Sequence, residues 1–395
     1  MTIMKKLFFM TAVVGLALTS CSQEDLGMPN QGDQNEITFA APVVGKLTRA
    51  NEVGNNYPTD PAYNFAVWAH YYADVFTTPA AGSLYMNEVI MGYNGTSKTW
   101  APVTAKYYWP KNGTLTFVGY SPARVDTPDT PVSYTDGKIT FTDYVVAADK
   151  SNQVDLMFSE RSYNQKKYTA SASDKTTDDV AGANGTGATP GVTDDVYTGA
   201  HLVFKHALSS VLFNVKTDKD YTTTDKTKIT LTGLTLNNVV SKGTFTQNIA
   251  ATAGSVTVAP TRDNGTGDAW VVSTDAADKV DYTIDNASHL LTTTAFWPAV
   301  NAESATAPQD FVNGLRKTDL MLIPQSLANV TLTVDYTIQS ETGAVIDQTS
   351  TINLSSLTGD DWDWGYRYIY TITIGLEEIT IEPYVTPWTD VTGDT

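Results

Sequence analysis

The sequence predicts an all-β protein built from two antiparallel β-sandwich domains in tandem. Charged residues make up only 17% of the chain, and Thr, Val, Tyr and Gly are abundant, which is a strand-and-turn composition. Short apolar stretches are separated by hairpin turn formers such as Asn94-Gly95 and Asp136-Gly137. After the first 20 residues, no stretch combines a 3.6-residue apolar period with helix caps. Many short strands without crossover helices favour sandwiches.

Residues 1–20 predict a lipoprotein signal peptide. Lys5 and Lys6 precede an apolar run, Leu7–Leu18, that is too short to span a bilayer as a mature helix. Leu18-Thr19-Ser20-Cys21 resembles the bacterial lipobox, in which cleavage before the cysteine leaves an acylated N-terminus. Cys21 is the only cysteine, so the chain can form no internal disulfide; an ordinary signal peptide with an incidental cysteine is the alternative. We expect the precursor to be anchored in the outer membrane through lipid on Cys21.

The charge balance excludes one class of partner. The chain has 43 acidic and 25 basic residues, a net charge of −18, and loss of Lys5 and Lys6 with the signal peptide makes it −20. Such a surface repels phosphate backbones, so we expect no nucleic-acid partner.

The N-terminal domain is expected at residues 50–199, after a polar tether that follows Cys21. The strands expected up to the end of this domain are Ile37–Ala41, Asn64–His70, Leu84–Met91, Ala105–Trp109, Leu115–Tyr120, Lys138–Phe141 and Val154–Phe158. Asn164–Ala200 is rich in Thr, Ala, Asp and Gly and predicts a long surface loop or part of the domain junction. The boundary is therefore located only to within residues 160–215.

The C-terminal domain is expected at residues 200–395. Its expected strands are Leu202–Leu208, Val211–Lys216, Lys228–Leu236, Gly243–Thr246, Ser255–Val258, Ala269–Ser273, Leu290–Trp297, Met321–Gln325, Val330–Gln339, Ala344–Leu354 and Tyr366–Ile374. Thr331–Ile338 alternates strictly between apolar and polar side chains, which is typical of an antiparallel sheet with one solvated face.

The C-terminal segment predicts one more strand, with Ile379, Ile381 and Val385 on one face. Pro383 and Pro387 lack N–H donors and therefore suit an edge position. The segment is either a strand that swings out to donate to another subunit or the last edge strand of its own domain, and both remain open.

No catalytic, cofactor or metal motif is found, so we predict a protein that is not an enzyme. None of the four histidines lies in HExxH, and CxxC, GxSxG and Walker motifs are absent from the sequence. Paired aspartates at 178–179, 194–195 and 360–361 lack EF-hand spacing; solvated loops are the simpler interpretation, and calcium binding is left open. Trp362 and Trp364 are either a glycan-stacking platform or aromatic residues that enter the core beside a strand.

Several short motifs, in their order along nearly the whole exported chain, resemble the fimbrillin-like family of Gram-negative anaerobes. These motifs are Tyr108-Trp109-Pro110, Leu115–Pro122, Asp155-Leu156-Met157, Leu202–Ala207, Leu322-Ile323-Pro324-Gln325, Trp364–Tyr368 and Val385–Trp388. The resemblance implies transthyretin-like sandwiches and a structural pilin subunit of type V fimbriae at the cell surface.

The resemblance also assigns roles to two positions. Cys21 corresponds to the lipidated cysteine, and Arg49 corresponds to the residue after which an arginine-specific surface protease cuts, so that Ala50 becomes the new N-terminus. Residues 21–49 are then a lipidated propeptide whose strand covers a groove that another pilin subunit later fills by strand exchange. Arg49 is the only arginine before Arg124 and precedes a polar stretch that a protease can reach; an ordinary surface arginine is the alternative.

The function expected from these observations is a pilin that polymerises and contributes to adhesion. The alternative is a membrane-anchored surface adhesin or glycan-binding lipoprotein, including a tip or accessory pilin, that recognises a ligand on a host or bacterial surface without polymerising. The sequence does not separate stalk, tip and anchor roles.

Overall fold

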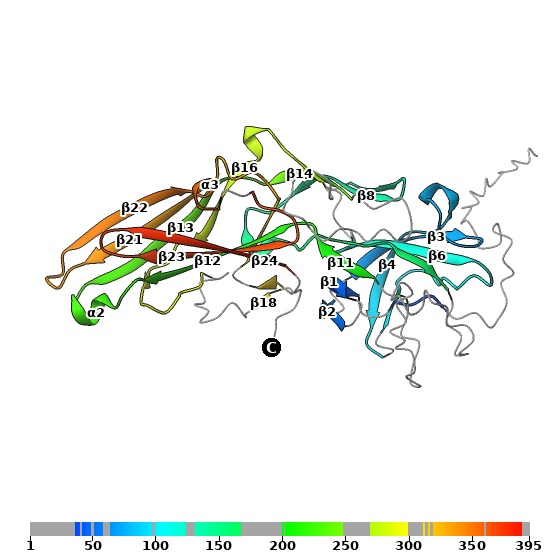
Figure 1. Ribbon diagram of the computed structural model, residues 1–395, viewed down its shortest axis with the longest axis horizontal. Coiled ribbons are helices and arrows are strands. Elements are labelled where there is room, and N and C mark those ends of the chain that lie inside the picture. Colours follow the sequence, from blue (N-terminus) through cyan, green and yellow to red (C-terminus); the bar gives the residue numbers. More distant parts are fainter. Residues whose placement is uncertain are drawn as a thin grey trace, which may run out of the picture. The chain divides into compact units, whose positions relative to one another are not determined.

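A computed structural model confirms the all-β class. Among the described residues, helix is confined to α2 (Tyr221–Thr224), α3 (Ser355–Thr358) and the 3-10 turns η2 (Pro79–Ala81), η3 (Lys150–Asn152) and η5 (Ala276–Asp278) (Figure 1). The structure describes residues 36–39, 42–48, 51–57, 64–96, 99–123, 131–166, 200, 202–247, 269–298, 311–312, 315–316, 319–358 and 361–388.

The largest sheet has nine strands in the order β2-β1-β11-β9-β6-β3-β4-β5, with β10 also paired to β6. Its strands are β1 (Val43–Thr48), β2 (Asn51–Asn56), β3 (Asn64–Tyr72), β4 (Ser83–Asn94), β5 (Thr99–Pro102), β6 (Thr114–Ser121), β9 (Met157–Ser159), β10 (Ser162–Gln165) and β11 (Val203–His206). Every pair is antiparallel except β1 with β11, which is parallel. All eight residues of β6 are buried, which shows that both faces of this sheet are covered.

A four-stranded sheet covers one of these faces and has the order β15-β14-β8-β7. Its strands are β7 (Val132–Thr135), β8 (Lys138–Val145), β14 (Lys242–Thr246) and β15 (Ala269–Val272). Phe141 of β8 lies opposite Phe245 of β14, and the Phe245 ring contacts the Phe158 ring of β9 at 4.9 Å between centroids. This sheet therefore combines strands from both sides of the expected boundary near residue 200.

The remaining large sheets form a sandwich from C-terminal strands (Figure 1). One sheet, β20-β12-β23-β24, consists of β12 (Ser209–Thr217), β20 (Leu320–Leu322), β23 (Tyr366–Ile374) and β24 (Ile379–Pro387). The other, β16-β13-β21-β22, consists of β13 (Lys228–Val240), β16 (Lys279–Asp285), β21 (Thr331–Gln339) and β22 (Val345–Asn353), with β17 (His289–Leu290) on β13. β18 (Phe311–Val312) pairs with β19 (Leu315–Arg316). Strands β12 and β23 are parallel.

Two groups of buried side chains form the cores. One core lies under the nine-stranded sheet and is dominated by aromatic residues, among them Phe65, Trp100, Phe117 and Phe204. The other continues from the four-stranded sheet into the C-terminal sandwich. The alternation predicted for Thr331–Ile338 is confirmed, because every second residue of β21 from Leu332 to Tyr336 is buried.

Some expected strands are wrong in extent. In Ala105–Trp109 only Tyr108 makes a ladder contact, a single bridge to Glu36, and Pro110 ends it because proline lacks the N–H that a ladder needs. In Leu290–Trp297 the strand stops at Leu290, and Phe296 makes one bridge to Val215. In Ile37–Ala41, of which residues 37–39 are described, only Phe39 makes bridges, one to Trp100 and one to Ala200, and these residues form no continuous strand. Ser255–Val258 lies outside the described residues.

Candidate functional site

The candidate site is the place in the nine-stranded sheet that the N-terminal segment, residues 36–48, occupies. Phe39 bridges Trp100 of β5 in antiparallel fashion and Ala200 in parallel fashion. Four residues later β1 begins and pairs with β11. Because β5 is the last strand at one end of the sheet order and β1 with β11 lies near the other, this segment joins the two ends. It is the closing strand of the sheet.

The backbone of this closing strand is hydrogen-bonded on both sides. The Phe39 N–H donates to the Trp100 carbonyl, and the Trp100 N–H donates back, each at 2.8 Å. The Ala200 N–H donates to the Thr38 carbonyl at 2.8 Å, and the Ile37 N–H donates to the Tyr107 carbonyl at 2.7 Å. A strand bonded along both edges is an interior strand, although it comes from the beginning of the chain.

Three apolar side chains of the segment complete the aromatic core. Ile37, Phe39 and Val44 are each 0% exposed. The Phe39 ring meets the rings of Phe65 and Phe117 edge to face, with centroids 5.8 Å and 5.1 Å apart. Their removal would leave the inner face of the sheet without the side chains that now cover it.

Arg49 and Ala50 lie outside the described residues, but both of their neighbours in the chain are placed. Thr48, the last residue of β1, is paired with Asn51, the first residue of β2. The predicted cleavage bond therefore falls in the two-residue connection between two paired strands. Cys21 also lies outside the described residues, so its lipidation stays a prediction.

Tyr57 follows β2 directly and is held in the same core. It is 1% exposed, and its ring lies 5.7 Å from Phe65 and 5.2 Å from Trp100 between centroids. Its hydroxyl donates to the Asn64 carbonyl at 2.8 Å and lies 2.5 Å from the Ser121 hydroxyl. The polar sequence around Tyr57 carries no signal for this role.

The C-terminal segment lies in place as edge strand β24. It pairs with β23 over its whole length, from Ile379 opposite Ile374 to Pro387 opposite Tyr366. Ile379, Ile381 and Val385 pack against the larger core, as their shared parity predicts. This arrangement corresponds to the second of the two interpretations left open by the sequence.

Trp388 closes the end of this edge strand. Its backbone N–H donates to the Gly365 carbonyl at 2.7 Å. Its ring stacks on His206 with centroids 3.6 Å apart and planes 4° apart. His206 Nδ1 lies 2.9 Å from Asp155 Oδ1, and both residues are buried. His206 is therefore a histidine buried in the core at the end of β11.

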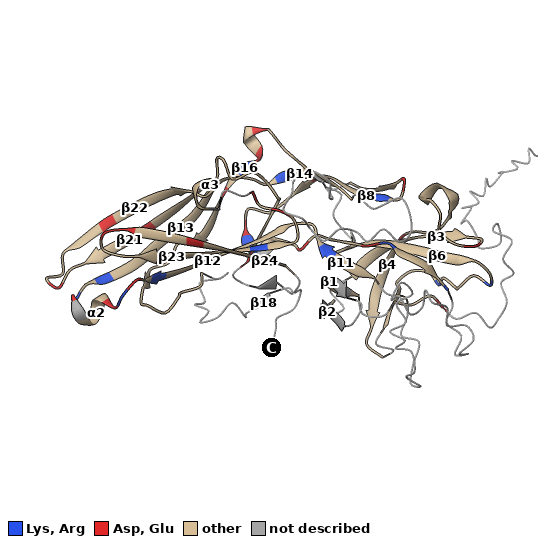
Figure 2. Cartoon of the chain, in the orientation of Figure 1, with Lys and Arg blue, Asp and Glu red and all other residues tan. Residues whose placement is uncertain are grey.

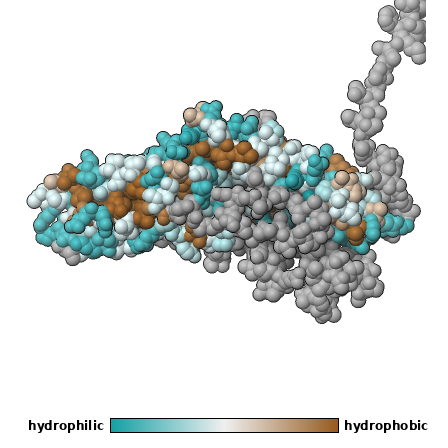
Figure 3. All heavy atoms as spheres, turned by 45° about the horizontal axis from the view of Figure 1, so that its top comes forward, coloured by the Kyte–Doolittle hydropathy of each residue, from teal (hydrophilic) through white to brown (hydrophobic). Residues whose placement is uncertain are grey.

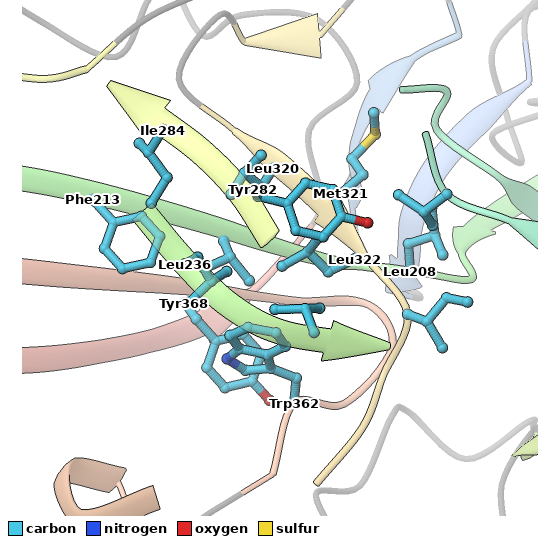
Figure 4. Packing of buried hydrophobic residues seen from close by; sticks show 14 of the residues in the cluster. Leu208, Phe213, Leu236, Tyr282, Ile284, Leu320, Met321, Leu322, Trp362 and Tyr368 are labelled. Carbon is cyan, nitrogen blue, oxygen red and sulfur yellow. The ribbon is translucent and has the colours of Figure 1, made fainter. Parts of the chain in front are cut away.

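Trp362 and Trp364, the two residues considered for glycan contact, differ in how far they are buried. Trp362 is 1% exposed, and its indole N–H donates to the Tyr370 hydroxyl at 3.0 Å. Figure 4 shows its ring beside Tyr368 within the core. Trp364 is partly buried and meets Phe158 at 5.6 Å between centroids. For Trp362 this is the core interpretation, and a ring so enclosed cannot stack on a sugar.

Among the described residues, the surface shows no cluster of metal-ligating, charged or apolar side chains that marks a further site. No group of three or more His, Cys, Asp or Glu side chains in the described ranges is placed to hold a metal ion. Figure 2 shows Lys and Arg at several separate places along the drawn chain, with a few near α2, and Figure 3 shows apolar surface in separate areas among hydrophilic residues. Among the helices of the described residues, none has the length and apolar character needed to cross a membrane.

These features define an all-β protein in which the aromatic core under the nine-stranded sheet is completed by the chain's own N-terminal segment. The sequence profile of the fimbrillin-like family matches residues 48–388, and the chain belongs to that family. No curated protein matches the chain significantly.

Two solved structures illustrate what the chain is similar to at low sequence identity. One, a fimbrial protein from Bacteroides vulgatus, is 16% identical with a TM-score of 0.45, over 90% of this chain and 100% of that one. The other, a protein of Bacteroides uniformis proposed to act in cell adhesion, is 14% identical with a TM-score of 0.44, over 91% and 100%.

Proposed function

We propose that the chain is a structural subunit of type V fimbriae that is exported as a lipoprotein on Cys21, cleaved after Arg49 and assembled by strand exchange. The fimbrillin-like family supports a fimbrial role at the cell surface that contributes to adhesion. Cleavage and strand exchange are proposed from the position that residues 36–48 occupy within the nine-stranded sheet. A strand that is interior to the sheet ends one residue before the arginine of the predicted cut.

Loss of the segment would leave a surface that another strand can repair. Ile37, Phe39 and Val44 are fully buried, and burial of each such side chain contributes roughly 1.5–3 kcal/mol. The N–H groups of Trp100 and Ala200 would also lose their acceptors. Unpaired strand edges beside apolar pockets favour addition of a strand from another chain. A neighbouring subunit that supplies an extended apolar segment restores both kinds of contact.

Cleavage explains how the exchange is controlled. Before the cut, the closing strand is covalently attached and competes with any incoming strand at the high local concentration of a tethered segment. After a cut between Arg49 and Ala50, only noncovalent contacts hold it. The precursor therefore remains closed at the membrane, and assembly begins where the protease acts.

The experiment is limited digestion of the purified full chain with an arginine-specific protease. We expect one early cut, a new N-terminus at Ala50, and oligomers on size-exclusion chromatography once residues up to 49 leave. The control, Arg49→Lys, should resist this cut and remain monomeric. A first cut elsewhere, or a cut chain that releases the segment and never associates, would refute the proposal.

The anchored-adhesin alternative makes a different prediction on cells. Protein recovered from the cell surface should begin at a blocked, lipidated Cys21 if the chain stays anchored, and at Ala50 if it is a processed pilin. N-terminal sequencing of that material separates the two functions.

A further inference from the structure

Strand β2 depends on the segment that cleavage would remove. Among the described strands, β1 is the only neighbour of β2, which is the last strand of the sheet order. All six residues of β2 are paired with β1, from Asn51 opposite Thr48 to Asn56 opposite Val43. When β1 leaves, β2 stays attached to the rest of the chain and loses its whole ladder.

The attachment of β2 survives the cut. Tyr57 is anchored by rings and hydroxyl contacts to Phe65, Trp100, Asn64 and Ser121, all of which lie after Arg49 in the chain. One backbone bond of Tyr57, from its N–H to the Pro42 carbonyl at 2.8 Å, is lost with the segment. Residues 50–56 are therefore an arm held at one fixed end.

The arm is unsuited to fill the vacated place itself. Its residues are Ala50-Asn51-Glu52-Val53-Gly54-Asn55-Asn56, with Val53 as the one larger aliphatic side chain. The places of Ile37 and Phe39 are fully buried and lined by aromatic rings. Enclosing Asn or Glu side chains there would leave polar groups without partners, which is unfavourable.

We infer that β2 is a clasp for the incoming strand, an inference that rests on the proposed function. A strand from a second subunit that takes the place of β1 lies between β11 and β2. It must run parallel to β11 and antiparallel to β2, because β1 does. The partner is thus an extended segment of one defined direction, with apolar side chains at the places of Ile37, Phe39 and Val44.

The register of the β1–β2 ladder shows which N–H groups of the clasp would donate backbone hydrogen bonds to the incoming strand. The pair Tyr57–Pro42 continues the β1–β2 ladder by one step, and the Tyr57 N–H donates across it. In an antiparallel ladder, bonded and non-bonded pairs alternate. The N–H groups of Val53 and Asn55 therefore face β1, whereas the N–H of Glu52 faces away.

Because adjacent N–H groups of β2 face in opposite directions, two neighbouring residues provide a matched pair of variants for the test. In Val53→Pro an N–H facing the incoming strand is removed, and in Glu52→Pro an N–H facing outward is removed from the adjacent residue. The full chain carrying each change is cut at Arg49, and uptake and release of a fluorescent peptide with the sequence of residues 35–48 are followed.

We expect Val53→Pro to release the peptide about twofold to tenfold faster than the unmodified cut chain, the effect of one backbone hydrogen bond, and Glu52→Pro to release it at the unmodified rate. Amide exchange at Val53 and Asn55 should be fast in the cut chain without peptide and slow with it. Equal release from both variants, or no protection of β2 by bound peptide, would overturn the clasp while leaving strand uptake intact. Failure of the unmodified cut chain to bind the peptide at all would refute the proposed function and the clasp with it.

Discussion

Phe39→Ala is the sharpest test of the closing strand. The Phe39 side chain is 0% exposed and makes edge-to-face contacts with Phe65 and Phe117. Truncation of a fully buried Phe to Ala lowers the free energy of unfolding by about 3 to 5 kcal/mol, including the cavity that is left. We expect a loss of this size in the precursor, measured by guanidinium denaturation. Thr38→Ala is the matched control, because Thr38 contributes its backbone carbonyl to Ala200 and the substitution retains it.

The same substitution should have no effect after processing. In the proposed processing residue 39 leaves with the segment, so mature chains from the two precursors would be the same molecule. In the cut but still associated state, 3 to 5 kcal/mol corresponds to a binding constant weaker by roughly two to four orders of magnitude. The segment should therefore leave the variant far more readily, and assembly should start sooner. A loss below about 1 kcal/mol, or a stability difference between the mature chains, would refute the role of Phe39 in a removable closing strand.

Three further predictions concern the rest of the molecule. Trp388→Ala removes the ring stacked on His206, and should lower the free energy of unfolding by about 3 kcal/mol and speed amide exchange across β24, whereas Tyr384→Ala, at a residue 64% exposed, should change neither. Burial lowers the pKa of Lys150 from 10.5 to about 8, so the unfolded chain binds more protons than the folded chain between these two values; stability should rise from pH 8 to pH 10.5, and Lys150→Met should flatten that slope in denaturation curves. Asp319→Asn weakens a buried ion pair with Arg367 at 3.2 Å and should cost about 3 kcal/mol in thermal unfolding, and a stability equal to that of the unmodified chain would contradict a paired buried charge.

The strands with the clearest patterns could be predicted from the sequence. The alternation of β21 matched a buried face, and the parity of Ile379, Ile381 and Val385 matched a partly buried face packed against the core, because period-2 burial is a local property of a strand. These successes depend on a residue and its near neighbours alone.

The pairing of distant segments could not be predicted. The pairs Phe141–Phe245 and Val44–Phe204 join residues more than 100 positions apart, and a strand's own pattern does not name its neighbour. Strand β2 gave no signal, since Asn, Glu and Gly are poor strand formers and its ladder is made by the backbone. Trp362 remained ambiguous because an aromatic residue beside a strand suits either the core or a surface platform.

Under the proposed function, a cut in the β1–β2 hairpin would reconcile two demands on the closing strand. It must hold the precursor together, which its interior position and three buried side chains achieve. It must also be replaceable, and a segment this well packed would not yield to an intermolecular competitor while tethered at millimolar effective concentration. One peptide bond, in the connection between Thr48 and Asn51, separates these states. Cutting it would change none of the contacts but would make the segment an ordinary ligand, and the proposed clasp would remain beside the vacated place to receive the next strand.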